Sequence, residues 1–365
     1  MKSPRAGLLA LLTGICSGPV CADPSSVTMF GYLNTDIEYI RGSGGAGMPS
    51  LWREANNLSF LGFKGTEDLG GNWRAFFQIQ GNVFVNRGTG NLADRDTFVG
   101  IGGPYGQVTM GYQLTPYRAS TWIPVDPFFM NTIGGANSIM GNGFFPGGNA
   151  QGNSSFDRRQ ANSVFYTSPT WHGLTLQTMY SLPNEKTATQ TPSLLSTALS
   201  FRSGSWYLSY AYEQHNSYFG PGTKDTGHRV GVSYTYGPFS VRGAAERLQF
   251  EPTPSTHLTR WAWQLASVYQ LASSSFRLSY LQAQAATGNS PTGVGGIGAA
   301  GVDSGARQVA LGYEYNLSKR TALFAVFSRL MNKSGTAYNY STNPVAITPT
   351  GMTLTGFGIG IGHNF

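Results

Sequence analysis

RVGVSYTY, residues 229 to 236, alternates between two kinds of side chain. In an extended chain Val230, Val232, Tyr234 and Tyr236 lie on one face, and Arg229, Gly231, Ser233 and Thr235 lie on the other. A period of two is typical of a β-strand whose faces meet different surroundings. One face suits lipid and the other suits water.

The same pattern recurs along the chain from Val27 onward, in stretches of about ten residues separated by turns or loops. Further examples are Phe239–Glu246, Arg260–Leu265 and Gln308–Tyr315. Counting these stretches gives about 16 strands, an even number that leaves an aqueous lumen when the sheet closes. Closure is required because an open sheet edge would leave unpaired backbone groups in hydrocarbon.

Connections between the stretches alternate between short and long. The predicted short turns are Thr66–Asn72, Gly103–Gly106, Pro169–Gly173, Ser203–Ser205, Gly237-Pro238, Leu271–Ser274 and Asn316–Lys319. Longer loops include Arg41–Asn56, Pro183–Pro192, Ala285–Asp303 and Met331–Gly351. Short turns on one side and long loops on the other are typical of outer-membrane barrels. We therefore predict an all-β fold, a transmembrane antiparallel β-barrel in the outer membrane of a Gram-negative bacterium.

Composition distinguishes this fold from a soluble β-sandwich, which also alternates. Only 11% of residues are charged, 13% are aromatic and 49 are glycine, whereas soluble domains carry about a quarter charged residues. Tyrosines also collect at predicted strand ends, where an interfacial girdle lies. A nucleic-acid partner is not expected, because the basic excess is modest and forms no stripe.

The N-terminus predicts a signal peptide over residues 1–22. Lys2 and Arg5 precede an apolar run, and Val20-Cys21-Ala22 supplies small residues before the predicted cleavage. The barrel then occupies residues 23–365. Both cysteines lie in the signal, so we expect no disulfide in the exported protein.

No motif for catalysis, a cofactor or a metal is present. Five histidines are scattered singly, so we expect no metal site and no cofactor. A barrel protease or phospholipase needs a base with an orienting partner, and none is evident from sequence. An adhesin is the other alternative, although the chain leaves no room for a passenger domain.

Seven separated motifs in order resemble the general porins of Gram-negative bacteria, most closely those of the β-proteobacterial type. The resemblance covers Ser25 to Phe365 and is carried by SVTMFG (26–31), GTEDLGG (65–71), FVG (98–100), VTMG (108–111), NSV (162–164), YTSP (166–169) and HNF (363–365). It implies a homotrimer of 16-stranded barrels with the third extracellular loop, about 114–157, folded into each lumen. It also implies that Phe365 belongs to the signal read by the barrel-assembly machinery, and that the partners are outer-membrane lipid, lipopolysaccharide, and small hydrophilic solutes and ions.

The same resemblance suggests residues for a pore constriction. By motif position, Arg95 matches a wall arginine and Arg158 or Arg159 matches another. Alternation places Arg74 and Lys64 on the lumen face, and Asp126 in Pro124–Pro127 is the best loop carboxylate. Two departures from the family, Phe60 and Tyr112, stand where arginines are common and would weaken the basic wall.

The third loop is unusually apolar, with Trp122, Ile123, Phe128, Phe129 and Met130. These side chains would either guide aromatic or sugar-like solutes or pin the loop to the wall, and we favour pinning because large aromatics are more often buried. We predict a general diffusion porin with weak anion preference. The alternative is a substrate-specific channel with a binding site at this loop.

Overall fold

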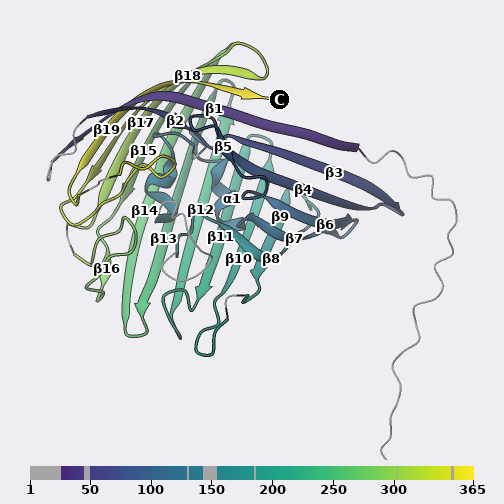
Figure 1. The fold of residues 1–365 in the computed structure, drawn as a ribbon, viewed down its shortest axis with the longest axis horizontal. Helices are drawn as coiled ribbons and strands as arrows, with labels where there is room; N and C mark the ends of the chain where they lie inside the picture. Colours follow the sequence, from purple (N-terminus) through teal and green to yellow (C-terminus); the bar gives the residue numbers. More distant parts are fainter. Residues whose placement is uncertain are drawn as a thin grey trace, which may run out of the picture.

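The computed structural model describes residues 26–44, 50–129, 131–142, 154–184, 186–301, 303–346 and 349–365. The predicted signal peptide, residues 1–22, lies outside the described residues. One antiparallel sheet runs around the molecule (Figure 1), and its first strand, β1 (Ser26–Ser43), pairs with its last strand, β19 (Thr353–Asn364). The sheet is therefore closed.

Sixteen strands form the wall in the part of the chain that the structure describes, as the sequence predicts. β2 (Leu51–Asn56) and β3 (Phe60–Gly70) both pair with β1 and act as one interrupted strand. β5 (Thr89–Gly90) and β16 (Thr287–Gly288) are two-residue additions. The remaining strands are β4 (Trp73–Phe84), β6 (Thr97–Gly103), β7 (Gly106–Leu114), β8 (Arg159–Thr167), β9 (Leu174–Ser181), β10 (Ser193–Ser203), β11 (Trp206–Asn216), β12 (Lys224–Tyr236), β13 (Phe239–Thr253), β14 (Thr256–Leu271), β15 (Ser274–Ala283), β17 (Ala306–Asn316) and β18 (Thr321–Asn332).

Alternate residues of each strand are buried, but here the apolar ones are exposed and the polar ones are buried, which is the reverse of a soluble protein. Val230 and Leu265 are 53% and 55% exposed, whereas Arg229 and Arg260 are 1% and 0% exposed. The apolar face points outward and the polar face points into the barrel, which is the arrangement that lipid outside and water inside require.

Two connections differ from the predicted pattern. The turn expected over Thr66–Asn72 is shorter, because β3 continues pairing with β4 through Thr66, Glu67 and Asp68. On the long-loop side, β13 and β14 are joined by only Pro254 and Ser255. Loop lengths at that end therefore vary more than strict alternation predicts.

The longest connection lies between β7 and β8 and contains most of the helical structure. It includes α1 (Pro116–Trp122), whose N-cap Thr115 accepts a hydrogen bond from the Arg118 backbone, and two 3-10 turns, η1 (Ala136–Ser138) and η2 (Met140–Asn142). Proline at the first helical position favours this start. No helix in the described ranges is long and apolar enough to cross a membrane.

Candidate functional site

Helix α1 is held against the polar face of β10, β11 and β12. The Tyr117 backbone N–H donates to Ser196 Oγ at 3.1 Å, and the Tyr207 hydroxyl donates to the Ser120 carbonyl at 2.6 Å. Arg229 Nη1 donates to Thr121 Oγ1 at 2.9 Å. Because these strand side chains lie on the inward face, the described part of the loop contacts the inner wall.

Glu246 on β13 is the centre of this attachment. Its carboxylate pairs with Arg229 Nη2 at 2.6 Å and Arg260 Nη1 at 2.7 Å. It also accepts the Gly141 backbone N–H of the loop at 2.9 Å. All three charged side chains are at most 1% exposed. The sequence places them on the polar face, but only the register of β12, β13 and β14 shows that they meet.

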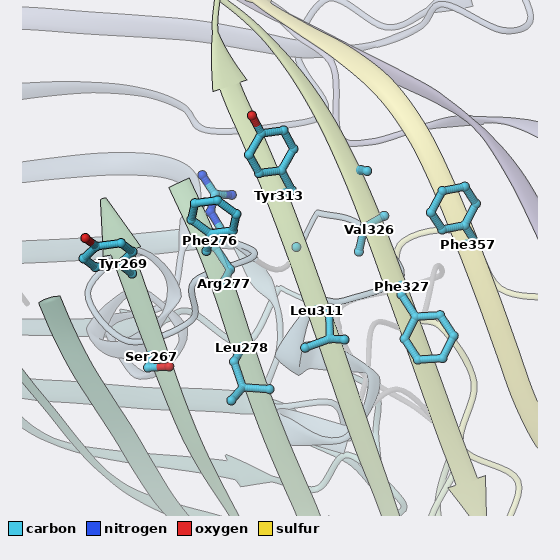
Figure 2. Close-up of a pocket in the computed structure, with 12 residues that line it drawn as sticks. Ser267, Tyr269, Phe276, Arg277, Leu278, Leu311, Tyr313, Val326, Phe327 and Phe357 are labelled. Carbon is cyan, nitrogen blue, oxygen red and sulfur yellow. The ribbon is translucent and has the colours of Figure 1, made fainter. Parts of the chain in front are cut away.

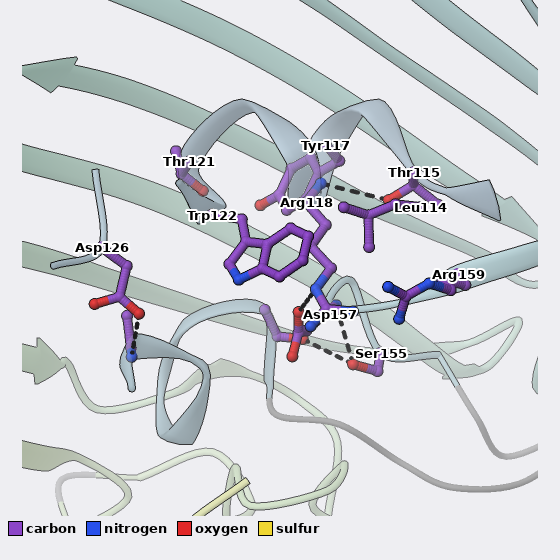
Figure 3. Close-up of polar contacts among 12 residues, drawn as sticks. Leu114, Thr115, Tyr117, Arg118, Thr121, Trp122, Asp126, Ser155, Asp157 and Arg159 are labelled. Atoms are coloured by element: carbon purple, nitrogen blue, oxygen red, sulfur yellow. Dashed lines mark hydrogen bonds and ion pairs between the residues drawn. The ribbon is translucent and has the colours of Figure 1, made fainter. Parts of the chain in front are cut away.

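Asp126 is fully buried within the loop. Its carboxylate accepts from the Phe128 and Ala136 backbone N–H groups at 3.2 and 3.0 Å, and from Gln264 Nε2 of β14 at 3.4 Å. Figure 3 labels it beyond the end of α1. The carboxylate therefore stabilises the loop and is not exposed to lumen water. This burial does not support the prediction that Asp126 belongs to the pore constriction.

The apolar residues of the loop mostly pack. Phe128 is 3% exposed and lies against Gly312 of β17, where a Cβ atom would come within 2.7 Å of the ring. Trp122 donates its indole N–H to the Phe129 carbonyl. Ile123, in contrast, is 60% exposed, and Met130 lies outside the described residues. These contacts support the interpretation that aromatic residues pin the loop to the wall.

Ion pairs form at the base of the loop. Arg118 of α1 pairs with Asp157, as Figure 3 shows, and Arg159 Nε pairs with Asp96 Oδ1 at 3.1 Å. Burial lowers the pKa of the Arg118 guanidinium. Burial opposes ionisation of Asp96, but Arg159 outweighs it and holds the pKa of that carboxyl below its usual range.

Arg95 lies between Asp94 and Asp96 just before β6. It is 3% exposed, donates to Asn82 Oδ1 at 3.1 Å, and sits 4.9 Å from the centre of the Phe60 ring. Burial, and then the charge of Arg159, lower its pKa to about 9. It still carries its charge at neutral pH.

The other predicted basic residues occupy different heights of the wall. Arg158 is 5% exposed, with its guanidinium 5.0 Å from the Tyr218 ring. Lys64 and Arg74 are exposed on β3 and β4, nearer the short turns. The structure thus brings Arg95 and Arg159 together beside Asp96, whereas Lys64 and Arg74 lie apart from them along the same wall.

His215 has partners that the sequence did not reveal. Its Nδ1 lies 2.7 Å from Ser154 Oγ and its Nε2 lies 2.8 Å from Glu213 Oε1. Phe156 and Tyr218 stack on the ring at 4.3 and 4.6 Å. The expectation that no histidine has an orienting partner is therefore wrong. Ser154, His215 and Glu213 are at most 2% exposed, so solvent does not reach this Ser–His–Glu arrangement, which fixes the end of the loop to β11.

Two further features complete the description. Phe365 exchanges backbone hydrogen bonds of 3.1 Å with Gly31 and so ends the seam between β19 and β1. A groove of about 480 Å³ lies on the outward face of β14 to β19, lined by Tyr269, Phe276, Leu311 and Phe357 among others (Figure 2). It is apolar and faces away from the lumen. Within the described residues, no cluster of three or more His, Cys, Asp or Glu side chains could hold a metal.

A closed antiparallel barrel with an apolar exterior, a polar interior and a long loop against its inner wall defines an outer-membrane channel. The chain belongs to the Gram-negative porin family, whose model matches residues 7–335. This match confirms the resemblance carried by the sequence motifs, and it places the protein in the outer membrane.

Relatives support the same assignment over the full length. Outer membrane porin protein 32 of Delftia acidovorans is 27% identical, across 99% of this chain and 100% of the relative. Major outer membrane protein P.IB of Neisseria meningitidis serogroup B is 23% identical, across 93% of this chain and 97% of the relative. The structure of the anion-selective porin from Comamonas acidovorans superimposes with a TM-score of 0.80 at 25% identity, covering 93% of this chain and 100% of the porin.

Proposed function

We propose that the protein is a general diffusion porin with weak anion preference, through which small hydrophilic solutes and ions cross passively. The observation that carries the anion preference is an imbalance among the inward charges. Asp96, Asp157, Glu38, Glu246 and Glu314 are each paired with an arginine. Lys64 and Arg74 are exposed, and in the described part of the chain neither forms an ion pair with a carboxylate. Asp68, also exposed, lies opposite Arg74 in the sheet and offsets part of this excess.

The position of these cations supports an effect on ions. Fixed charges beside a narrow aqueous path with low-dielectric walls raise the local concentration of counter-ions. We propose that Arg95 and Arg158 add positive charge at the base of the third loop, where Arg159 is already paired with Asp96. We propose that this loop narrows the pore, because its described residues are anchored to β10 to β17 and occupy part of the interior.

The test is the reversal potential of the refolded protein in a planar bilayer under a KCl gradient. We expect a chloride-to-potassium permeability ratio above one. The double variant Lys64→Gln/Arg74→Gln should lower the ratio toward one, whereas Arg320→Gln, which removes an exposed charge from the turn before β18, should leave it unchanged. Cation selectivity in the unaltered protein would overturn the proposal.

Several parts of this function rest on the family. We propose that the chain forms a homotrimer, that residues 1–22 are removed on export, and that Phe365 is read by the barrel-assembly machinery. Lipopolysaccharide and outer-membrane lipid would surround the apolar exterior. The mass of the protein extracted from outer membranes, measured with and without denaturation, tests the first two points together.

We also propose that the chain has no catalytic activity and is not an adhesin. The buried Ser154, His215 and Glu213 support this, since a nucleophile must meet its substrate. Their role is to hold the loop. Measurable hydrolysis of ester or peptide substrates that disappears in Ser154→Ala would contradict it.

A further inference from the structure

Four phenylalanines and two cations share one part of the inner wall. Phe30 on β1, Phe60 on β3, Phe76 on β4 and Phe98 on β6 lie beside Lys64 and Arg74; we refer to these six residues as the aromatic lane. Their strands are neighbours in the sheet (Figure 1). Aromatic residues on the lumen-facing side of a barrel need an explanation, because such positions are normally polar.

Strand register shows that the lane faces inward. Lys64 is opposite Gln78, Gln78 is opposite Phe98, and directly paired residues share a face of the sheet. The intervening residues Met29 and Val99 are 56% and 61% exposed on the outward face. The lane is therefore part of the lumen and does not belong to the lipid-facing surface.

Each cation of the lane lies near a ring. Lys64 Nζ is 5.2 Å from the centre of the Phe30 ring, and the Arg74 guanidinium is 5.6 Å from that of Phe76. These distances are within the range of cation–π attraction. Phe30 packs over Gly62, where a Cβ atom would come within 2.7 Å of the ring. The rings are thus held on the wall but remain partly exposed, and both cations remain exposed.

The described residues of the third loop make their hydrogen bonds to the wall away from the lane. Those from α1 and the following turns go to side chains of β10 to β14 and β17, on the other part of the wall. At the upper end a small cavity of about 60 Å³ lies between Phe129 and Thr132 of the loop and Tyr32 and Asn34 of β1. A solute that passes the loop on this side therefore meets the lane.

We propose that the aromatic lane binds aromatic carboxylates during passage, so that the pore favours this class over aliphatic acids of equal charge. The proposal rests on the channel function above and names a solute class for it. An exposed cation with no carboxylate partner attracts the anionic group, and a neighbouring ring offers a face for stacking. A benzoate-like solute supplies both groups in one small molecule. Neutral sugars would use the rings but not the cations.

The experiment measures how organic anions reduce chloride conductance of the refolded protein in a planar bilayer. Benzoate is compared with cyclohexanecarboxylate, which has the same charge and similar size, and with benzyl alcohol, which is aromatic but neutral. A stacking contact adds about 0.5–1.5 kcal/mol, so we expect benzoate to half-saturate at a concentration roughly two- to tenfold lower than cyclohexanecarboxylate.

Substitutions separate the contribution of the phenylalanine rings from that of the two cations. Phe30→Leu/Phe76→Leu should abolish the difference between benzoate and cyclohexanecarboxylate while leaving both anions attracted. Lys64→Gln/Arg74→Gln should weaken both anions. Arg202→Gln is the matched control: Arg202 is also exposed and lies 4.3 Å from a ring, but that ring, Tyr207, is only 4% exposed. It should not alter the benzoate preference.

The outcomes distinguish this inference from the function on which it rests. Conductance with equal half-saturation for benzoate and cyclohexanecarboxylate overturns the aromatic preference and leaves the porin intact. Stronger interference by benzyl alcohol than by benzoate would assign the rings to neutral solutes and also overturn it. A refolded protein that gives no conductance would instead overturn the channel function.

Discussion

Glu246 joins the third loop to the barrel wall through polar contacts that no sequence motif indicates. It joins two arginines of neighbouring strands to Gly141 of the loop, and all three charged groups are buried. Removing one member of a buried ionic group leaves the others uncompensated. The side chain therefore links barrel stability to the position of the loop.

We expect Glu246→Gln to lower the free energy of unfolding by about 3 kcal/mol or more, because two buried guanidiniums lose their counter-charge. Urea unfolding of the protein in lipid vesicles measures this, and single-channel recordings should show noisier conductance as the loop loses its attachment. Glu67→Gln, at an exposed position near the first turn, is the control and should be neutral. Unchanged stability in Glu246→Gln would show that the loop is held by its other contacts.

At the scale of elements, strand periodicity was sufficient to predict the fold but not the site. Alternation depends on neighbours along the chain, and so residues 229–236 predict their own two faces. Pairing of Arg229 with Glu246, or of His215 with Ser154, depends on where strands and loop meet in space. The same limit applies to Asp126: its residue type and position suggested a carboxylate of the pore constriction, but backbone N–H groups of its own loop surround it.

The pairing of β19 with β1 also depends on a close approach of the two backbones that cannot be predicted from the sequence. A Cβ atom on Gly360 would lie 2.4 Å from the backbone oxygen of Thr35, which cannot move without disturbing the ladder. On Gly362 the nearest atom is the Tyr32 hydroxyl, at 2.7 Å, the far end of a flexible side chain. We expect Gly360→Ala to cost about 1–3 kcal/mol and Gly362→Ala to cost clearly less. Heat-dependent mobility of the folded form in gels compares them, and equal loss in both would contradict this account of the seam.

For the whole molecule, the inward charges should make selectivity depend on ionic strength. The screening length falls from about 10 Å at 0.1 M salt to about 3 Å at 1 M. We therefore expect the chloride-to-potassium permeability ratio to be greatest in dilute KCl and to decline toward one in concentrated KCl. Reversal potentials measured at a constant tenfold gradient over rising mean concentration give this curve, and a ratio independent of concentration would point to size exclusion as its source.

The hydrogen bonds between Phe365 and Gly31 have a consequence for biosynthesis. β1 can pair with β3 early in synthesis, but its second neighbour, β19, is available only after residues 353–364 have been made. Until then any partial barrel keeps two unpaired borders, which lipid does not tolerate. Closure must consequently wait for the last strand, and a chain that lacks β19 should fail to form a closed barrel.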